Sequence, residues 1–274
     1  MWHVVLSVVC AEASYAVLSS YAGVFASRTT AFIMSGYAVL GVILALTNRA
    51  AGQMFRDLRR RDNLARFLPR QVAERVIAEG PLALAPIERE VTVLFSDIRG
   101  FTTMSEHMGP RDVLAMLDDY FARMSGVVKS RDGVVGKFLG DGLLAFWGAP
   151  DRLDDHAARA VEAARDMRRV VEELNAERAR AGLAPIAIGI GIHTGTVAAG
   201  MLGGALQAEY TIIGDAVNVA SRIEGLTKEH HLDVLISETT QAALADGLTR
   251  RVAEAEIRGR AEPIVLYTLT RDSR

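Results

Sequence analysis

"VLFSDIRGFTTMSE", residues 93 to 106, is an apolar, strand-like run that ends in Asp97 and is soon followed by Gly100. A strand that stops in an aspartate, with a glycine that lets the backbone turn closely beyond it, places a carboxylate and free amides where a cation and a phosphate could meet. The competing interpretation is that Asp97 caps the helix that follows. The stretch therefore predicts either a metal site or a helix cap at this strand end.

The composition excludes several classes of protein. The chain has 274 residues, and 50% of them are hydrophobic, which is enough for a substantial core. Its 33 acidic and 31 basic residues give a net charge of −2, so there is no overall attraction to nucleic acid. Cys10 is the single cysteine, which rules out an intrachain disulfide and a cysteine-based metal site.

The first 48 residues are strongly apolar. Residues 4 to 26 contain one charge, Glu12, and residues 29 to 47 contain none, which predicts two transmembrane helices that anchor the chain. Residues 48 to 62 carry five arginines against two aspartates, a bias typical of the cytoplasmic side of a membrane. We therefore expect an inner-membrane protein whose remaining chain is cytoplasmic. A signal peptide is the alternative interpretation of the amino terminus, although a basic first region is missing.

The rest of the chain reads as a connector followed by one domain. Residues 49 to 89 are charged, show helical spacing of apolar positions and end in a stretch that contains glycine and proline, which indicates a helical connector and a linker. From residue 90 to residue 271, strand and helix patterns alternate. Helices are expected at 110 to 130 and 154 to 180, and a hairpin at "GVVGKFLGDGLLAFWGA". The predicted fold class is α+β, with helices on a mixed sheet.

One predicted strand has two unequal faces. In "IAIGIGIHTG", which begins at Ile186, isoleucines alternate with alanine and glycines, a period of two that gives one bulky and one nearly bare face. We expect a helix to pack closely on the bare face.

Several polar residues could build a nucleotide site. Asp141 lies in a tight turn between two glycines, and with Asp97 it could hold divalent metal through oxygen ligands. Lys137 precedes Asp141 with the same strand parity, and Asn218 and Arg222 share one face of the helix after "YTIIGD". An amide and a guanidinium side by side suit ribose and phosphate oxygens. Taken singly, the lysine could be a solvated hairpin residue, the asparagine a capping amide and the arginine part of a surface ion pair.

Four motifs in order resemble the class III nucleotidyl cyclases: "VTVLFSDIRGFT", "GKFLGDGLLAFWG", "GIHTGTVAAGMLG" and "YTIIGDAVNVASRIEGL". The resemblance covers about residues 88 to 270. It implies a class III cyclase domain with a ferredoxin-like βαββαβ core. It further implies that ATP is converted to 3′,5′-cyclic AMP and pyrophosphate, in two sites at a homodimer interface.

The resemblance also assigns roles to individual residues. Asp97 and Asp141 would bind two divalent metal ions, Mg²⁺ or Mn²⁺, together with the backbone of Ile98, and the amides near Gly100 and Phe101 would meet the phosphates. The base, ribose and phosphate contacts fall on five further residues. Those are Lys137 and Thr211 for the purine, Asn218 for the ribose, Arg222 for the α-phosphate and Arg260, with Arg258 as the alternative, for the triphosphate.

The choice of base follows from hydrogen bonding. Adenine N1 is an acceptor that suits the ammonium group of Lys137, whereas guanine presents donors that would suit an acidic residue. Lysine therefore favours ATP. Thr211 departs from the aspartate of many adenylyl members, and its hydroxyl discriminates less sharply. The alternatives are a guanylate cyclase or a catalytically weak or dead cyclase-like module that dimerises and relays a signal. We expect core or turn roles for His193 and Trp147.

Overall fold

The computed structural model describes residues 2–21, 32–33, 35–51, 72, 75, 85–203, 209–257 and 262–270. The chain divides into two compact units, Met1–Arg66 and Phe67–Arg274. The larger unit holds all the described residues of the predicted catalytic domain. Most of the predicted connector, residues 49 to 89, lies outside the described residues.

The amino-terminal unit contains helix α1 (Trp2–Tyr21) and a further helical stretch at residues 35 to 51. No helix in the described part of the chain combines the length and the apolar character that crossing a bilayer requires. Within α1, His3, Glu12 and four serines interrupt the apolar residues and lower the mean hydropathy. The predicted transmembrane helices are therefore not supported by the structure, and parts of both predicted spans lie outside the described residues.

The larger unit alternates strands and helices, as the sequence predicts. Its elements are β1 (Ile87–Ile98), α4 (Phe101–Glu106), α5 (Pro110–Ser130), β2 (Val134–Leu139), β3 (Gly142–Trp147), α6 (His156–Arg180), β4 (Ile188–Leu202), β5 (Glu209–Ile213), α7 (Asp215–Glu229), β6 (Val234–Ser237), α8 (Glu238–Gln241), β7 (Thr249–Ala255) and β8 (Ile264–Leu269).

One mixed sheet organises this unit. The described strands follow the order β2-β3-β1-β4-β6-β8-β7, and β5 pairs with β4 beside this path. Strands β4 and β6 are parallel, and the other pairs are antiparallel. The first four strands, with α4 and α5 after β1 and α6 after β3, form the expected βαββαβ core. The predicted α+β class and the β2–β3 hairpin are confirmed.

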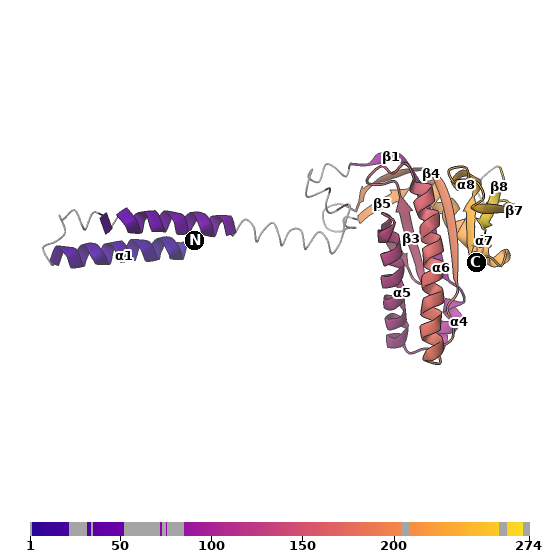
Figure 1. Ribbon diagram of the computed structural model, residues 1–274, viewed down its shortest axis with the longest axis horizontal. Helices are drawn as coiled ribbons and strands as arrows, with labels where there is room; N and C mark the ends of the chain where they lie inside the picture. Colours follow the sequence, from indigo (N-terminus) through magenta and orange to yellow (C-terminus); the bar gives the residue numbers. More distant parts are fainter. Residues whose placement is uncertain are drawn as a thin grey trace. The chain divides into compact units, whose positions relative to one another are not determined.

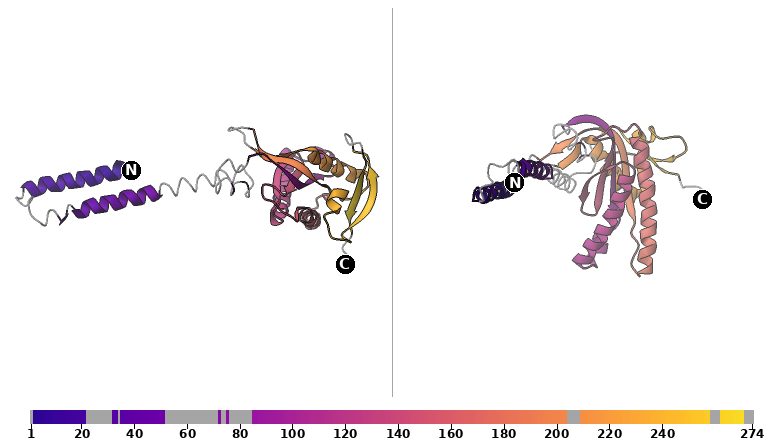
Figure 2. Two further views of the ribbon diagram at one scale, coloured as in Figure 1. Left: turned by 90° about the horizontal axis from the view of Figure 1, so that it is seen from above. Right: turned by 60° about the vertical axis from the view of Figure 1, so that its left-hand side comes forward.

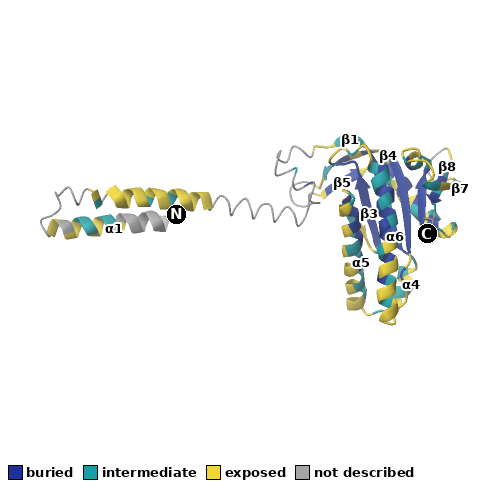
Figure 3. Ribbon diagram, in the orientation of Figure 1, coloured by how far each residue is buried: buried dark blue, intermediate teal, exposed yellow. Residues whose placement is uncertain are grey.

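Helices α5 and α6 cover one face of the sheet, side by side (Figures 1 and 2). Their inner faces and the even-numbered residues of β1, such as Leu94 and Ile98, form the main core with Tyr120 and Met167. The outer faces of both helices are exposed (Figure 3). Alternate residues of a strand point to opposite faces, so Asp97 belongs to the other face of the sheet.

Helix α7 packs on that other face, against the bare side of β4. A Cβ atom on Gly191 would collide with the backbone nitrogen of Glu224 and the carbonyl oxygen of Ala220. A Cβ atom on Gly189 would likewise collide with the side chains of Glu224 and Thr227. Glycine is required because the helix backbone approaches the strand so closely. The predicted close packing of a helix on the bare face is confirmed.

Candidate active site

Asp97 and Asp141 meet at one end of the sheet. Asp97 is the penultimate residue of β1, and Asp141 lies in the turn between β2 and β3. The two carboxyl groups lie close enough for the charge of Asp141 to act on Asp97. Antiparallel pairing of β1 with β3 brings the start of β3, just after Asp141, to the end of β1, where Leu143 pairs with Ser96. The predicted pair of carboxylates is therefore assembled within a single chain.

The environment of Asp97 favours its neutral form. Burial raises the pKa of the Asp97 carboxyl above its usual value, and the negative charge of Asp141 raises it further. The ammonium group of Lys228 opposes this, because its Nζ lies 4.0 Å from Asp97 Oδ2. Two carboxylates that disfavour each other's charge are a good receptor for a divalent cation, which relieves the repulsion and takes oxygen ligands. The donor set therefore fits the expected Mg²⁺ or Mn²⁺.

Two α7 residues beside this pair were not anticipated from the sequence. The Glu224 side chain lies between α7 and β4, against Gly189. Burial, and then the negative charge of Asp97, raise the pKa of the Glu224 carboxyl. Lys228 follows it by one helical turn. A signal for them exists in the sequence, since an acid and a base at i and i+4 share a helix face. Only the packing of α7 shows that this helix face lies against the end of the sheet that carries Asp97 and Asp141, which we call the metal edge.

The backbone after Asp97 turns as the sequence suggests. Gly100 has φ 65°, in the left-handed region, and it precedes α4 as the N-cap residue. The amide of Met104 donates to the Gly100 carbonyl oxygen at 3.0 Å, and Phe101 begins the helix and packs partly against the core. Because Gly100 holds the capping position, the interpretation of Asp97 as a helix cap is wrong.

Lys137 lies beside β5. Its Nζ is 3.1 Å from Glu209 Oε1, and the two side chains are 38% and 48% exposed. Glu209 is two residues before Thr211 on β5, so the two side chains share a face of that strand. The structure thus directs the Lys137 ammonium group toward the strand that carries Thr211. Thr211 itself is only 6% exposed, so Lys137 is the more accessible of the two predicted base-reading residues.

Asn218 and Arg222 are both exposed on α7. The buried face of the helix consists of Ala216, Val219, Ala220, Ile223 and Thr227. The predicted placement of the amide and the guanidinium on one helix face is therefore confirmed, and that face is turned away from the sheet.

Within a single chain, Thr211 lies far from the carboxylates along β4, whereas Lys137 lies in the same hairpin as Asp141. Asp97 pairs with Gly189 near the start of β4, whereas Thr211 pairs with Gly200 near its end. The interval from Gly189 to Gly200 corresponds to roughly 35 Å of extended strand. The carboxylates lie on the sheet side of α7, and Asn218 and Arg222 lie on its outer side.

The remaining predictions have mixed outcomes. Arg260, the predicted triphosphate contact, lies outside the described residues. His193 is buried inside β4 and not in a strand-end turn, and its Nδ1 is 2.9 Å from Ser237 Oγ. Trp147 is fully buried at the end of β3, and its indole nitrogen donates to the Arg131 carbonyl oxygen at 2.9 Å. Both therefore have the expected structural roles.

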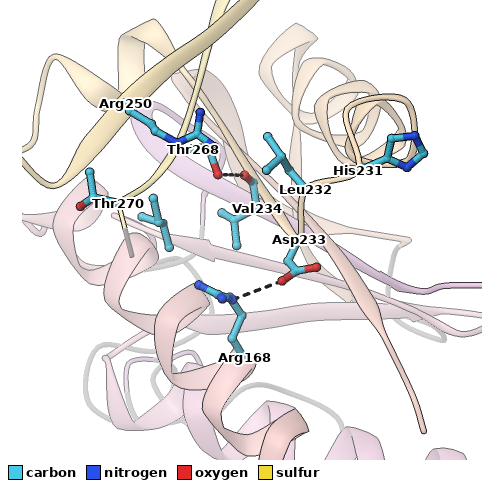
Figure 4. Close-up of a pocket in the computed structure, with 9 residues that line it drawn as sticks. Arg168, His231, Leu232, Asp233, Val234, Arg250, Thr268 and Thr270 are labelled. Carbon is cyan, nitrogen blue, oxygen red and sulfur yellow. Dashed lines mark hydrogen bonds and ion pairs between the residues drawn. The ribbon is translucent and has the colours of Figure 1, made fainter. Parts of the chain in front are cut away.

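The described residues contain no group of three or more His, Cys, Asp or Glu side chains that could hold a metal by itself. A pocket of about 440 Å³ opens elsewhere, between α6 and the strands β6, β7 and β8 (Figure 4). Arg168, Arg250 and Asp233 line it, and Arg168 Nε lies 3.5 Å from Asp233 Oδ2. None of the predicted site residues lines this pocket.

Comparison with known sequences agrees with this geometry. The model of the "Adenylate and Guanylate cyclase catalytic domain" family matches residues 85–271. "Adenylate cyclase 1" of Rhizobium meliloti is 34% identical over 237 residues, a match that covers 86% of this chain and 35% of that protein. The chain thus spans about a third of the length of this relative.

Solved structures of both nucleotide specificities resemble the domain. The adenylyl cyclase CyaB from P. aeruginosa has a TM-score of 0.65 at 32% identity, and the match covers 70% of this chain and 98% of that one. The guanylyl cyclase Cya2 has a TM-score of 0.62 at 33% identity, covering 67% of this chain and 93% of that one.

Proposed function

The chain belongs to the adenylate and guanylate cyclase catalytic-domain family, and on that basis we propose that it is an adenylate cyclase. It converts ATP to 3′,5′-cyclic AMP and pyrophosphate, at two sites that a homodimer shares. The relatives named adenylate cyclase and the presence of all five key residues, Asp97, Asp141, Lys137, Asn218 and Arg222, support this proposal.

The metal edge supplies the triphosphate end of each site. Asp97 and Asp141 would hold the two divalent ions, with the backbone of Ile98 as a further oxygen ligand. The chemistry that these ions supply when bound is activation of the ribose 3′-hydroxyl and neutralisation of the triphosphate. The exposed turn at Gly100 and the first amides of α4 face the phosphates.

The outer face of α7 supplies the ribose and α-phosphate contacts. Asn218 orients the ribose so that its 3′-oxygen is in line with the α-phosphorus. Arg222 places its guanidinium against the charge that grows on the α-phosphate in the transition state. An interaction that is stronger in the transition state than in the bound substrate increases the turnover rate more than it increases the affinity for substrate.

The base is adenine because Lys137 donates to its N1 acceptor. In the nucleotide-free chain the ammonium group is paired with Glu209, so it must turn from this carboxylate to the base. Guanylate cyclase activity is the second candidate, because Thr211 can also serve guanine and the structural neighbours include a guanylyl cyclase. Product formation from ATP and from GTP, each with Mn²⁺ and with Mg²⁺, distinguishes the two.

The single observation that carries the dimer proposal is the separation of Asp97 from Thr211 within one chain. Asp97 lies at one end of β4 and Thr211 at the other, so a site that uses both needs a second chain. A two-fold pair brings the carboxylates of one chain to Lys137, Thr211, Asn218 and Arg222 of its partner, twice.

A mixing experiment tests this arrangement. Asp97→Ala and Arg222→Ala should each be nearly inactive alone. When the two purified variants exchange subunits, half of the dimers are hybrids, and each hybrid has one intact and one doubly damaged site. Activity should therefore return to roughly a quarter of wild type. No recovery under conditions where subunit exchange is demonstrated would mean that the sites are not shared.

An inner-membrane location with a cytoplasmic catalytic domain is also part of the proposal. The apolar residues 29 to 47 and the arginines that follow them support it. Fractionation of cells that express the whole chain tests it, and recovery of the protein in the soluble fraction would contradict it.

A further inference from the structure

Arg99 joins the metal edge to the end of helix α7. Its backbone nitrogen donates to the Ala187 carbonyl oxygen at 2.8 Å, which extends the pairing of β1 with the chain before β4. Its Nε donates to the Ile188 carbonyl oxygen at 3.3 Å. Its Nη2 donates to the carbonyl oxygens of Thr227, at 3.3 Å, and Leu232, at 2.6 Å. The side chain is half-buried and is thus committed to three main-chain acceptors.

Two of these acceptors belong to the carboxyl end of α7. Thr227 lies in the last turn of the helix, where carbonyl groups lack partners within the helix, and Leu232 lies in the loop just after it. A guanidinium at a helix carboxyl terminus is favourable both as a hydrogen-bond donor and as a charge. Lys228 Nζ, 4.0 Å from Asp97 Oδ2, is a second link between the same turn and the metal edge.

The proposed catalytic residues lie further back along α7, Arg222 at its middle and Asn218 one turn nearer its start. Arg222 is five residues before Thr227, which is roughly 7.5 Å along the helix axis. The backbone of α7 is packed directly on Gly189 and Gly191, so the helix between these points moves as a rigid body. A shift at the Arg99 end is therefore transmitted to Arg222.

We propose that Arg99 is a positioning residue that couples the two sites of the dimer. It follows Asp97 and Ile98 directly, so it is placed by the metal-binding turn of its own chain. Through Thr227 and Leu232 it fixes the helix whose Asn218 and Arg222 act in the partner's site. The proposal rests on the shared sites described above. It assigns to Arg99 a role that the established roles of the motif residues do not include.

The shared sites allow this role to be isolated. In a hybrid of Asp97→Ala with Arg222→Ala, the one intact site takes its carboxylates from the Arg222→Ala chain and its Arg222 from the Asp97→Ala chain. Arg99→Gln is introduced into one chain or the other. On the Asp97→Ala chain, it lies beside a metal edge that is already inactive, so it can affect the intact site only through α7.

We expect Arg99→Gln on the Asp97→Ala chain to lower kcat of the hybrid about tenfold, with KM for ATP unchanged within a factor of two. On the Arg222→Ala chain, it should lower kcat much less. Arg99→Lys on the Asp97→Ala chain should recover part of the loss, because an ammonium group can still donate to one carbonyl. Arg152→Gln, which removes an exposed arginine paired with Asp154, is the matched control and should have no effect.

A second measurement does not depend on activity. Hydrogen exchange at residues 230 to 232, whose amides bond the last turn of α7, should be about tenfold faster in nucleotide-free Arg99→Gln. Unchanged exchange would overturn the proposal.

Three kinetic results would also overturn it. An equal loss of kcat in both hybrids would show a role in fold stability alone. A loss of kcat only when Arg99→Gln is on the Arg222→Ala chain would show a role confined to the metal edge of that chain. An unchanged kcat in both hybrids would show that Arg99 has no such role. Failure of the parental hybrid to regain activity would instead disprove the shared sites, so the two proposals fail separately.

Discussion

The two halves of the proposed site are built in opposite ways. The metal edge is closed within one chain, where Asp97 and Asp141 contact each other and Lys228 lies 4.0 Å from Asp97. The nucleoside half is open, because Asn218 and Arg222 stand exposed on the outer face of α7. Lys137 forms a partly exposed ion pair with Glu209.

This difference indicates how the side chains of each half are positioned. The carboxylates are positioned by strand pairing and by burial, and their mutual repulsion prepares them for a cation. In the proposed dimer, the nucleoside half would gain further contacts from a partner chain and from the substrate. We therefore expect changes at the metal edge to act within each chain, and changes on α7 to act across the dimer.

The largest effect is expected at the metal edge. Asp97→Asn or Asp141→Asn removes an anionic ligand at nearly constant shape, so turnover should fall at least about a thousandfold. Thermal unfolding without metal should show that each variant is folded. Asp97→Asn should in addition be more stable than wild type, because it removes a partly buried like-charge interaction with Asp141.

Asp119→Asn is the matched control for this pair. Asp119 is an exposed carboxylate on α5 that pairs with Arg123, and its loss should leave turnover unchanged. Near-normal activity of either metal-edge variant at ordinary Mg²⁺ concentration would refute the two-metal arrangement.

An intermediate effect is expected at the base-reading half. Lys137→Glu places a carboxylate opposite an acceptor on adenine, so kcat/KM for ATP should fall roughly ten- to a hundredfold and activity with GTP should rise. The paired variant Glu209→Gln frees the lysine without removing it. Because that ion pair is exposed, its loss should change KM for ATP by no more than about threefold. Unchanged ATP kinetics in Lys137→Glu would exclude this residue from base reading.

The smallest effect concerns pH. Because the pKa of Asp97 is raised in the folded chain, the folded state holds this proton to higher pH than the unfolded state. The metal-free fold therefore loses stability as the pH rises through that raised pKa. A divalent metal must displace the proton, so Mn²⁺ without nucleotide should stabilise the fold more at pH 7.5 than at pH 5.

Thermal unfolding with and without Mn²⁺ measures this difference. At about ten times the dissociation constant, the metal contributes about 1.4 kcal/mol, or a rise in Tm of about 2–4 °C. The rise should disappear in Asp97→Asn. An equal rise at both pH values would contradict the link between metal binding and the protonation of Asp97.

The local elements were predictable because each depends on neighbouring residues. Apolar periodicity indicated α5 and α6, and the glycine pair around Asp141 indicated the β2–β3 hairpin. The alternation of isoleucine and glycine in β4 even predicted the close packing of a helix. The membrane prediction did not gain support, because no helix in the described part of the chain has the length and apolar character to cross a bilayer, and parts of both predicted spans lie outside that part.

The sequence by itself determined which residues are proposed to carry the chemistry, because the motifs fix residue types and their local spacing along a strand or helix. Only the tertiary structure decided which of them meet. Strand pairing joins Asp97 to Asp141, while the length of β4 separates both from Thr211. Packing of α7 on a glycine face brings Glu224 and Lys228 to the metal edge, and it places Arg99 on the helix end. Such contacts join residues far apart in the chain, so no local pattern could determine them.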